Sequence, residues 1–201
     1  MKIHDEKKTC SNKAEVKILL TGYTNADCRG KGEEETTRCT TTLIRDGKFV
    51  IISDPGVLES QQILINALAR ENLTVTDITH VFITHSHMDH YRNIGMFSDA
   101  IAIDYWGLWE GAKNEKLPEK LSDNINFIKT PGHSYDGMTM IAKTNDGKIA
   151  VVGDLWWSER GPAQDPYANN LNELKKSREK IPALADFIIP GHGEMFRTGC
   201  K

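Results

Sequence analysis

The stretch Thr84-His85-Ser86-His87-Met88-Asp89-His90 (THSHMDH) holds three of the seven histidines in this chain of 201 residues. The apolar, β-branched run before it, ITHVFI, predicts a buried strand that delivers the stretch to a sheet edge. In an extended segment, residues i and i+2 face the same way, so His85 and His87 can present two imidazoles to one metal ion. Asp89 and His90 fall beyond the strand and are free to face a neighbouring ion. A catalytic tetrahedral ion needs only three protein ligands, so the stretch predicts either unused residues or two metals.

Three more candidate ligands follow other predicted strands. His133 in TPGHS, Asp154 in VVGD and His192 in IPGHG each come directly after a glycine, which lets the backbone turn sharply at the sheet edge. A carboxylate such as Asp154 can bridge two cations. The two remaining histidines, His4 and His80, are expected to be bystanders.

The rest of the pattern indicates β-hairpins separated by helices. We predict strands over residues 16–23, 39–54, 78–85, 100–103, 125–130, 138–144, 149–154 and 186–191, and helices over 58–71 and 169–181. Asp46-Gly47 and Asn145-Asp146-Gly147 are predicted to close two hairpins. Residues 24–38 are polar and should form a mobile surface loop. This predicts an α/β or α+β fold, with a polar tail over residues 1–15 and one domain over 16–201.

Composition restricts the class of partner and the compartment. The formal charge of −3 gives no basic field of the kind that captures nucleic acid, which is neither required nor excluded. The polar N-terminus lacks a secretory signal and no apolar run approaches the ~20 residues of a membrane span, so we expect a cytoplasmic protein without a membrane contact. The four cysteines form no CxxC pair and are expected to be reduced, although a Cys28–Cys39 disulfide stays open.

The candidate ligands, in their order along the chain, resemble those of the metallo-β-lactamase fold superfamily. Asp54 in IISDPG matches that family's first aspartate, which lies behind the metal ligands, and the resemblance covers about Lys17 to Phe196. It implies a four-layer αββα sandwich with the site at one edge. It also implies one metal on His85, His87 and His133, a second metal on Asp89, His90 and His192, and Asp154 between them.

The same resemblance implies a dinuclear metal-dependent hydrolase that uses a metal-bridging hydroxide. Asp89 would be catalytic, orienting the hydroxide and passing a proton to the leaving group. The cofactors would be two divalent ions, zinc first, with iron or manganese also suited to the same donors, since no cysteine lies near the ligands in the sequence. Asp154 resembles the thioesterase, lactonase and nuclease branches, and His87 argues against oxygen-reducing diiron relatives, which usually carry glutamate there.

The substrate class is the least determined property. Neither a C-terminal helical region nor a large inserted domain is present in the sequence, so we expect an ester-like carbonyl substrate (a thioester, lactone or β-lactam) and a small-molecule partner. Similarity to small family members linked to RNA processing keeps a phosphodiesterase or ribonuclease, acting on RNA or DNA, as the alternative. A non-catalytic metal-binding protein is the second alternative.

Two loop features could shape the specificity. All four tryptophans are predicted to lie just after strands, where they either line an apolar substrate pocket or pack beneath loops: Trp106, Trp109, Trp156 and Trp157. The run Glu33-Glu34-Glu35 lies either in a flap over the site or in a solvated loop.

Overall fold

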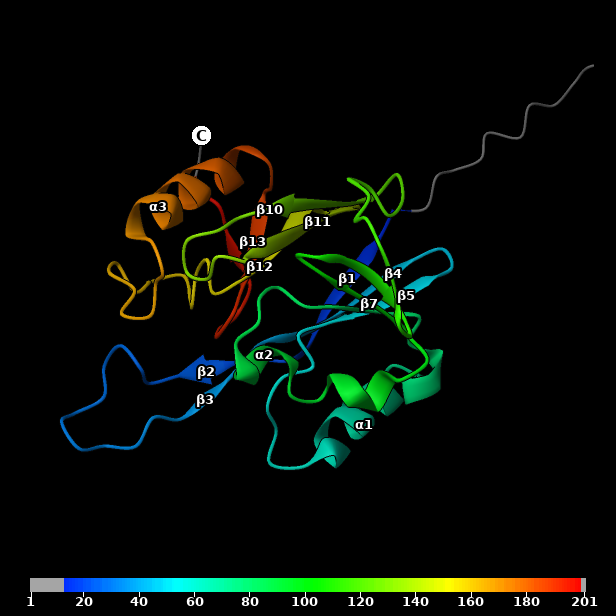
Figure 1. The fold of residues 1–201 in the computed structure, drawn as a ribbon, viewed down its shortest axis with the longest axis horizontal. Coiled ribbons are helices and arrows are strands. Elements are labelled where there is room, and N and C mark those ends of the chain that lie inside the picture. The colour runs from blue at the N-terminus through cyan, green and yellow to red at the C-terminus, as the bar shows by residue number, and fades with distance from the viewer. Residues whose placement is uncertain (1–12, 200–201) are drawn as a thin grey trace, which may run out of the picture.

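Residues 13–199 are described by the computed structural model, in which two β-sheets lie between helices (Figure 1). The first sheet has the strand order β1-β4-β5-β6-β7-β8-β9. Its strands are β1 Glu15–Leu20, β4 Thr41–Asp46, β5 Phe49–Ser53, β6 His80–Phe82, β7 Ile101–Asp104, β8 Gly107–Glu110 and β9 Lys113–Glu115. The second sheet has the order β10-β11-β12-β13-β14, with β10 Ile125–Lys129, β11 Met138–Thr144, β12 Gly147–Gly153, β13 Phe187–Pro190 and β14 Phe196–Arg197.

The remaining elements are short. A separate ribbon pairs β2 Tyr23–Thr24 with β3 Thr37–Arg38. The α-helices are α1 Gln61–Arg70, α2 Met88–Tyr91 and α3 Leu171–Lys180, and 3₁₀ turns cover Val75–Asp77, Ile94–Phe97 and Ile181–Ala183. Side chains cap the two longer helices: the Ser60 hydroxyl accepts from the Gln62 N–H, and Asn170 accepts from the N–H groups of Asn172 and Glu173.

Alternation along single strands produces three apolar layers. In β5, Ile51 faces the second sheet and Ile52 faces α1. In β12, Val151 faces the first sheet and Val152 faces α3. Each sheet therefore buries one face against the other sheet and its opposite face against helices. The fold is the four-layer αββα sandwich that the family resemblance implied.

Most predicted elements are present with shifted ends, and both predicted hairpins, β4–β5 and β11–β12, are confirmed. Four strands, β3, β8, β9 and β14, were missed because they are short and polar or lack strict alternation. The prediction that every tryptophan follows a strand is wrong for Trp109, which lies within β8.

The predicted placement of His85 and His87 on a strand is wrong. Strand β6 ends at Phe82, so His85 and His87 lie in the loop after it rather than on the strand. Asp89 and His90 lie on α2, a helix of four residues that begins directly after His87. Turn geometry, not strand alternation, therefore brings this stretch together.

Residues 24–38 are more ordered than predicted, since their ends pair as β2 and β3 in a ribbon close to α2 (Figure 1). Inside the segment, the Asn25 side chain bonds to the backbone of Glu34 and Thr36. None of the helices within residues 13–199 is both long and apolar enough to cross a bilayer. The assignment of residues 16–201 to one domain stays a prediction.

Candidate metal centre

The candidate ligands lie at the ends of strands and in the loops that follow them, on one edge of both sheets. Asp154 follows β12 and His192 follows β13, and these strands are parallel neighbours. The THSHMDH stretch follows β6, which is parallel to β5 and β7. Carboxyl ends of parallel strands meet at one sheet edge, where open sheets usually bind ligands. His133 reaches the same place from the loop between β10 and β11.

All seven predicted ligands converge. Their ligand atoms form two groups, each with members within 4.8 Å of one another: His85, His87, His133 and Asp154, and Asp89, His90 and His192. The Asp154 carboxylate lies between the groups, since Oδ1 is 3.1 Å from His90 Nε2 and Oδ2 is 3.4 Å from His133 Nε2. Asp154 Oδ2 is also 3.1 Å from His192 Nε2. The two groups of atoms match the two half-sites expected from the sequence. The role of each residue as a metal ligand stays a prediction.

Protein groups hold the outer nitrogens of four of these histidines. His90 Nδ1 lies 3.0 Å from Asp54 Oδ2, and His133 Nδ1 lies 2.5 Å from Asp165 Oδ2. His192 Nδ1 lies 3.0 Å from the carbonyl oxygen of Arg38, and His85 Nδ1 lies 3.2 Å from the Thr84 hydroxyl. Metal-binding histidines usually donate their second N–H in this way, which fixes the ring and leaves the other nitrogen for the ion.

Buried polar atoms that lack hydrogen bonds show that the residues of the cluster fit a metal ion. His85 Nε2 is buried without a hydrogen-bond partner, and His90 Nε2 and Asp154 Oδ1, which lie 3.1 Å apart, make no hydrogen bond of normal geometry. Buried polar atoms without partners are costly and rare in folded proteins. Nitrogen and oxygen donors of this kind suit divalent cations, and several such atoms gathered at one point are satisfied together by a bound ion.

Burial and neighbouring charges set the protonation states. Burial, followed by the charge of His90, lowers the pKa of His85 well below its usual range. For His90, burial also lowers the pKa, but the carboxylates of Asp154 and Asp54 together outweigh it and raise the pKa well above its usual range. Burial raises the pKa of Asp154, but the surrounding imidazoles lower it by a larger amount. The pKa therefore lies well below its usual range, and this carboxylate is ionised. A cation that bound here would displace protons from the imidazoles.

The glycines before the ligands act in two different ways. Gly153 has a φ of +56°, a left-handed conformation that turns the chain at Asp154. Gly191 needs no unusual φ; a Cβ at this position would lie 1.8 Å from Asp154 Oδ1. The prediction that the glycines before the ligands turn the backbone therefore holds at Gly153 and at Gly132, whose φ is +141°, whereas Gly191 provides space.

Two residues around the cluster were missed by sequence reasoning. Asp165 lies in the long loop before α3, with no motif around it, and only the fold brings it to His133. Cys39 is far from every ligand in sequence, yet its buried thiol donates to the carbonyl of Asp54, behind the cluster. Burial raises the pKa of this thiol, which is therefore neutral. Both Cys28 and Cys39 are free, which rules out the disulfide between them.

A cavity of about 300 Å³ opens onto the cluster. The part of its wall outside the candidate ligands consists of Thr24, Ala26, Glu35, Thr37, Trp157 and Tyr167. Residues 24–38 thus contribute a wall of the site: of the run Glu33-Glu34-Glu35, only Glu35 lines the cavity, while Glu33 and Glu34 are exposed, as the solvated-loop alternative expected. The Tyr167 hydroxyl donates to the Glu35 carboxylate, and the Tyr167 ring stacks on Trp157 at 5.9 Å. Trp157 lies edge-on to His133 and His192.

The four tryptophans have different environments. Only Trp157 lines the cavity at the cluster. Trp156 packs under α3 with Arg178 and Phe196, and Trp109 donates from Nε1 to Asp104. Trp106 is 58% exposed. The pocket hypothesis therefore holds for one tryptophan and the packing hypothesis for others.

An αββα sandwich with this histidine and aspartate cluster defines a class of protein, the metal-dependent hydrolases, which use such a site for divalent ions. The profile of the Metallo-beta-lactamase superfamily matches residues 36–128. Metallo-beta-lactamase domain-containing protein 1 of Xenopus laevis is 30% identical over 193 residues, covering 91% of this chain and 81% of the relative. The chain belongs to the metallo-beta-lactamase superfamily.

Solved structures agree on the fold. A Thermotoga maritima protein with a provisional metallo-beta-lactamase assignment has a TM-score of 0.72 at 20% identity, covering 92% of this chain and 100% of that one. AidC, a dizinc quorum-quenching lactonase in complex with its product N-hexanoyl-L-homoserine, has a TM-score of 0.65 at 17% identity, covering 83% and 78%.

Proposed function

We propose that this chain is a dinuclear metal-dependent hydrolase that cleaves an ester-like carbonyl group in a substrate without a second negative charge near the scissile bond. The observation that carries the proposal is the cavity at the cluster, whose lining combines five of the seven candidate ligands with Trp157, Tyr167 and Glu35 and, among the described residues, includes neither lysine nor arginine. Small-molecule sites are typically cavities of this size with a few placed polar groups.

Each of the two groups of candidate ligands would hold one metal ion. His85, His87 and His133 would bind one divalent ion, and Asp89, His90 and His192 would bind the other, with Asp154 between them. Bound ions of this kind supply Lewis acidity, which makes water nucleophilic near pH 7 and polarises a carbonyl oxygen. Zinc is the first choice, with iron or manganese compatible with the same donors.

Asp89 is the residue proposed to move the proton. Its Oδ2 lies 3.6 Å from His192 Nε2 and accepts from the Thr37 hydroxyl at 3.3 Å, and its side chain is partly exposed to the cavity. A carboxylate held at one oxygen keeps the other positions free to take a proton from water and deliver it to the leaving group. The same hydrogen bond from Thr37 ties the segment of residues 24–38 to the reacting end of the cavity.

The wall opposite the cluster would position the acyl part of the substrate. Trp157 and Tyr167 present stacked aromatic surface, which suits an apolar chain. The lactonase AidC, whose solved structure holds an acyl-homoserine product, supports this substrate class by analogy of fold alone.

Charge on the wall argues against polyanions. A negative group outside the reacting centre would face the Glu35 carboxylate, which is paired with Arg29 at 3.3 Å, and the cavity lining offers it no lysine or arginine. A nucleic acid has a phosphate on each side of the scissile bond, and its capture normally uses several lysine or arginine contacts. Neutral lactones and thioesters are therefore favoured over ribonucleic acid and over β-lactams, whose ring carries a carboxylate.

The test is a substrate panel on protein reconstituted with two ions per chain. We expect turnover of an acyl-homoserine lactone or a neutral acyl thioester, and little or none of a chromogenic cephalosporin, a bis-aryl phosphodiester or single-stranded RNA. In the Glu35→Gln variant, the difference in turnover between neutral and anionic substrates should become smaller. Cleavage of the phosphodiester and RNA alone would contradict the proposal and favour the nuclease alternative.

A further inference from the structure

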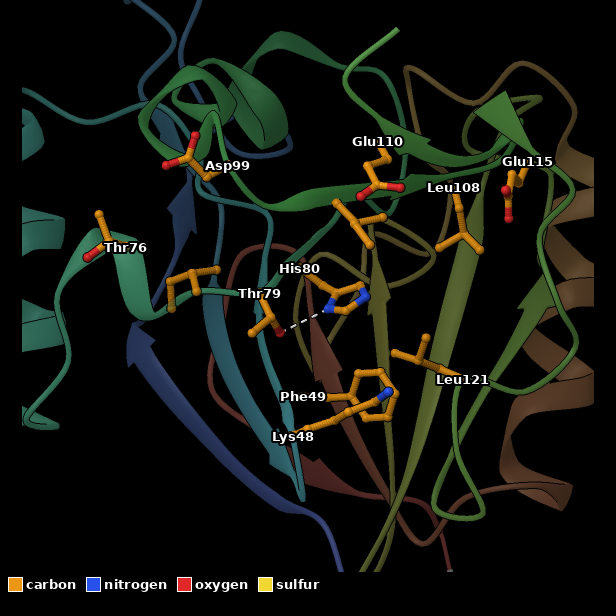
Figure 2. A pocket seen from close by; sticks show the side chains of 12 residues that line it. Lys48, Phe49, Thr76, Thr79, His80, Asp99, Leu108, Glu110, Glu115 and Leu121 are labelled. Carbon is orange, nitrogen blue, oxygen red and sulfur yellow. Dashed lines mark hydrogen bonds between the residues drawn. The ribbon is translucent and has the colours of Figure 1, made fainter. Parts of the chain in front are cut away.

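A cavity of about 590 Å³ lies at the other end of strand β6 and shares no lining residue with the cavity at the metal centre. Its apolar lining consists of Phe49, Ile78, Ile101, Leu108 and Leu121, of which Phe49, Leu108 and Leu121 are labelled in Figure 2. Except for buried Ile78, these side chains are only partly covered by the protein. A cavity of this volume, which combines apolar side chains with polar and charged groups, is compatible with a site for a small organic molecule.

One buried polar side chain points into this cavity. The imidazole of His80, 8% exposed, lies above Phe49 and below Leu108 and Glu110 in Figure 2, and its ring meets that of Phe49 edge-on at 5.3 Å. Its Nδ1 lies 2.9 Å from the Thr79 hydroxyl. The Thr79 hydroxyl hydrogen is already donated to the carbonyl of Val50 at 3.0 Å.

This network assigns the tautomer of His80. Since Thr79 Oγ1 donates elsewhere, it accepts from His80, so Nδ1 carries the hydrogen and Nε2 is an acceptor. No hydrogen bond to Nε2 is present among residues 13–199. Burial, followed by the charge of Lys48, lowers the pKa of His80, so the ring is neutral at pH 7. The cavity therefore offers an unfilled acceptor surrounded by apolar surface.

The rim of the cavity is mainly acidic. Asp99, Glu110 and Glu115 lie at the top of the view in Figure 2, and Lys48 lies alone at the bottom, beside the ring of Phe49. Glu115 is paired with Lys113, which leaves Asp99 and Glu110 as carboxylates without an ion pair of their own in the described part of the chain. A ligand with a protonated amine would gain from both carboxylates, whereas a carboxylic acid would be repelled.

We propose that this cavity is a second ligand site, distinct from the metal centre, that binds a small hydrophobic amine. The apolar body packs on Phe49, Ile101 and Leu108, and the ammonium group lies at the end bearing Asp99 and Glu110. An ammonium N–H or a ligand hydroxyl donates to His80 Nε2. The proposal is independent of the reaction at the metal centre because the two cavities have no residue in common.

A series of probes with one body and three charges tests the proposal: 4-phenylbutylamine, 4-phenylbutanol and 4-phenylbutyrate, titrated into the zinc-loaded full chain by calorimetry. We expect the amine to bind at least about tenfold more tightly than the acid, with the alcohol between them, and this preference to shrink as salt screens the carboxylates. Equal affinity for the amine and the acid, or a preference for the acid, would overturn the proposal.

The location is tested by variants and by backbone amide signals. The double substitution Asp99→Asn and Glu110→Gln should remove most of the preference for the amine over the alcohol, and Glu59→Gln, which changes an exposed glutamate outside both cavities, should leave it intact. Binding of the amine should shift the amide signals of Phe49, Thr79 and Leu108. Shifts confined to His87 and Asp154, or an undiminished preference in the double variant, would place the amine at the metal centre and refute the second site.

Discussion

The two ends of strand β6 carry histidines in opposite settings. Beyond its C-terminal end, His85 joins a cluster in which imidazoles alternate with carboxylates and buried atoms lack partners. At its start, His80 bonds to a threonine hydroxyl and faces apolar side chains. The cavity at His80 is about twice the volume of the one at the cluster, about 590 against 300 Å³. Donor chemistry, not size, therefore distinguishes the candidate catalytic site.

The largest contrast is expected from removing the shared carboxylate. Asp154→Ala deletes the group between the two half-sites, so we expect loss of at least one ion per chain and a fall in kcat of at least about 100-fold. The matched change at the other end of the strand, His80→Phe, should retain both ions and full turnover. Metal content by mass spectrometry and kinetics on a neutral lactone measure both. Two ions and normal turnover in Asp154→Ala would refute the ligand assignment.

A smaller effect on metal binding is expected from Asp165, which contacts the candidate ligand His133. Asp165→Ala removes the carboxylate that holds His133 Nδ1, and losses of this kind typically weaken metal binding by about 10–100-fold. Asp99→Ala removes a carboxylate from the other cavity and should not change metal affinity. Competition with a chelator measures the affinity of each variant. Unchanged affinity in Asp165→Ala would mean that His133 needs no orienting partner.

Modest effects are expected at the cavity wall. Tyr167→Phe keeps the ring that stacks on Trp157 but removes the hydroxyl bonded to Glu35, so we expect KM to rise by about 2–10-fold with kcat nearly unchanged. Tyr135→Phe, at an exposed tyrosine outside this cavity, is the control. A fall in kcat of about 100-fold would instead give the Tyr167 hydroxyl a part in the reaction itself.

The smallest expected effect is on the pH dependence of stability. The pKa of His80 is lowered in the folded chain, so the folded state resists protonation while the unfolded chain takes up a proton near 6.5. This contribution to stability is therefore present above pH 6.5 and is lost as the pH falls from there toward the folded pKa. In metal-loaded protein, the drop in Tm between about pH 7.5 and 5.5 should be smaller in His80→Phe than in the parent chain. A larger drop in Tm in His80→Phe than in the parent chain would mean that the pKa of His80 is raised, not lowered, in the folded chain.

Elements with strong local patterns were predictable. The hairpin of β4 and β5 follows from β-branched residues around Asp46-Gly47, and α1 follows from apolar residues at helical spacing behind the Ser60 cap. Strands β8 and β9 were not, because their side chains are partly or wholly exposed and their pairing depends on neighbours along the sheet. The loop position of His85 was missed for a related reason: strand β6 ends where its pairing partners end.

The sequence by itself determined the donor set, since three histidines and an aspartate within seven residues, and three more donors after strands, leave few roles other than metal binding. The pattern of predicted hairpins and helices gave an α/β or α+β fold, and the family resemblance implied the sandwich of two facing sheets that is present. Only the tertiary structure decided which groups surround the donors. Glu35 and Cys39 lie in irregular backbone on either side of β3, and Asp165 and Tyr167 lie in the loop before α3; packing of the two sheets brings these distant regions together. Contacts between distant segments have no local signature, so the substrate wall and the cavity at His80 were visible only in the folded chain.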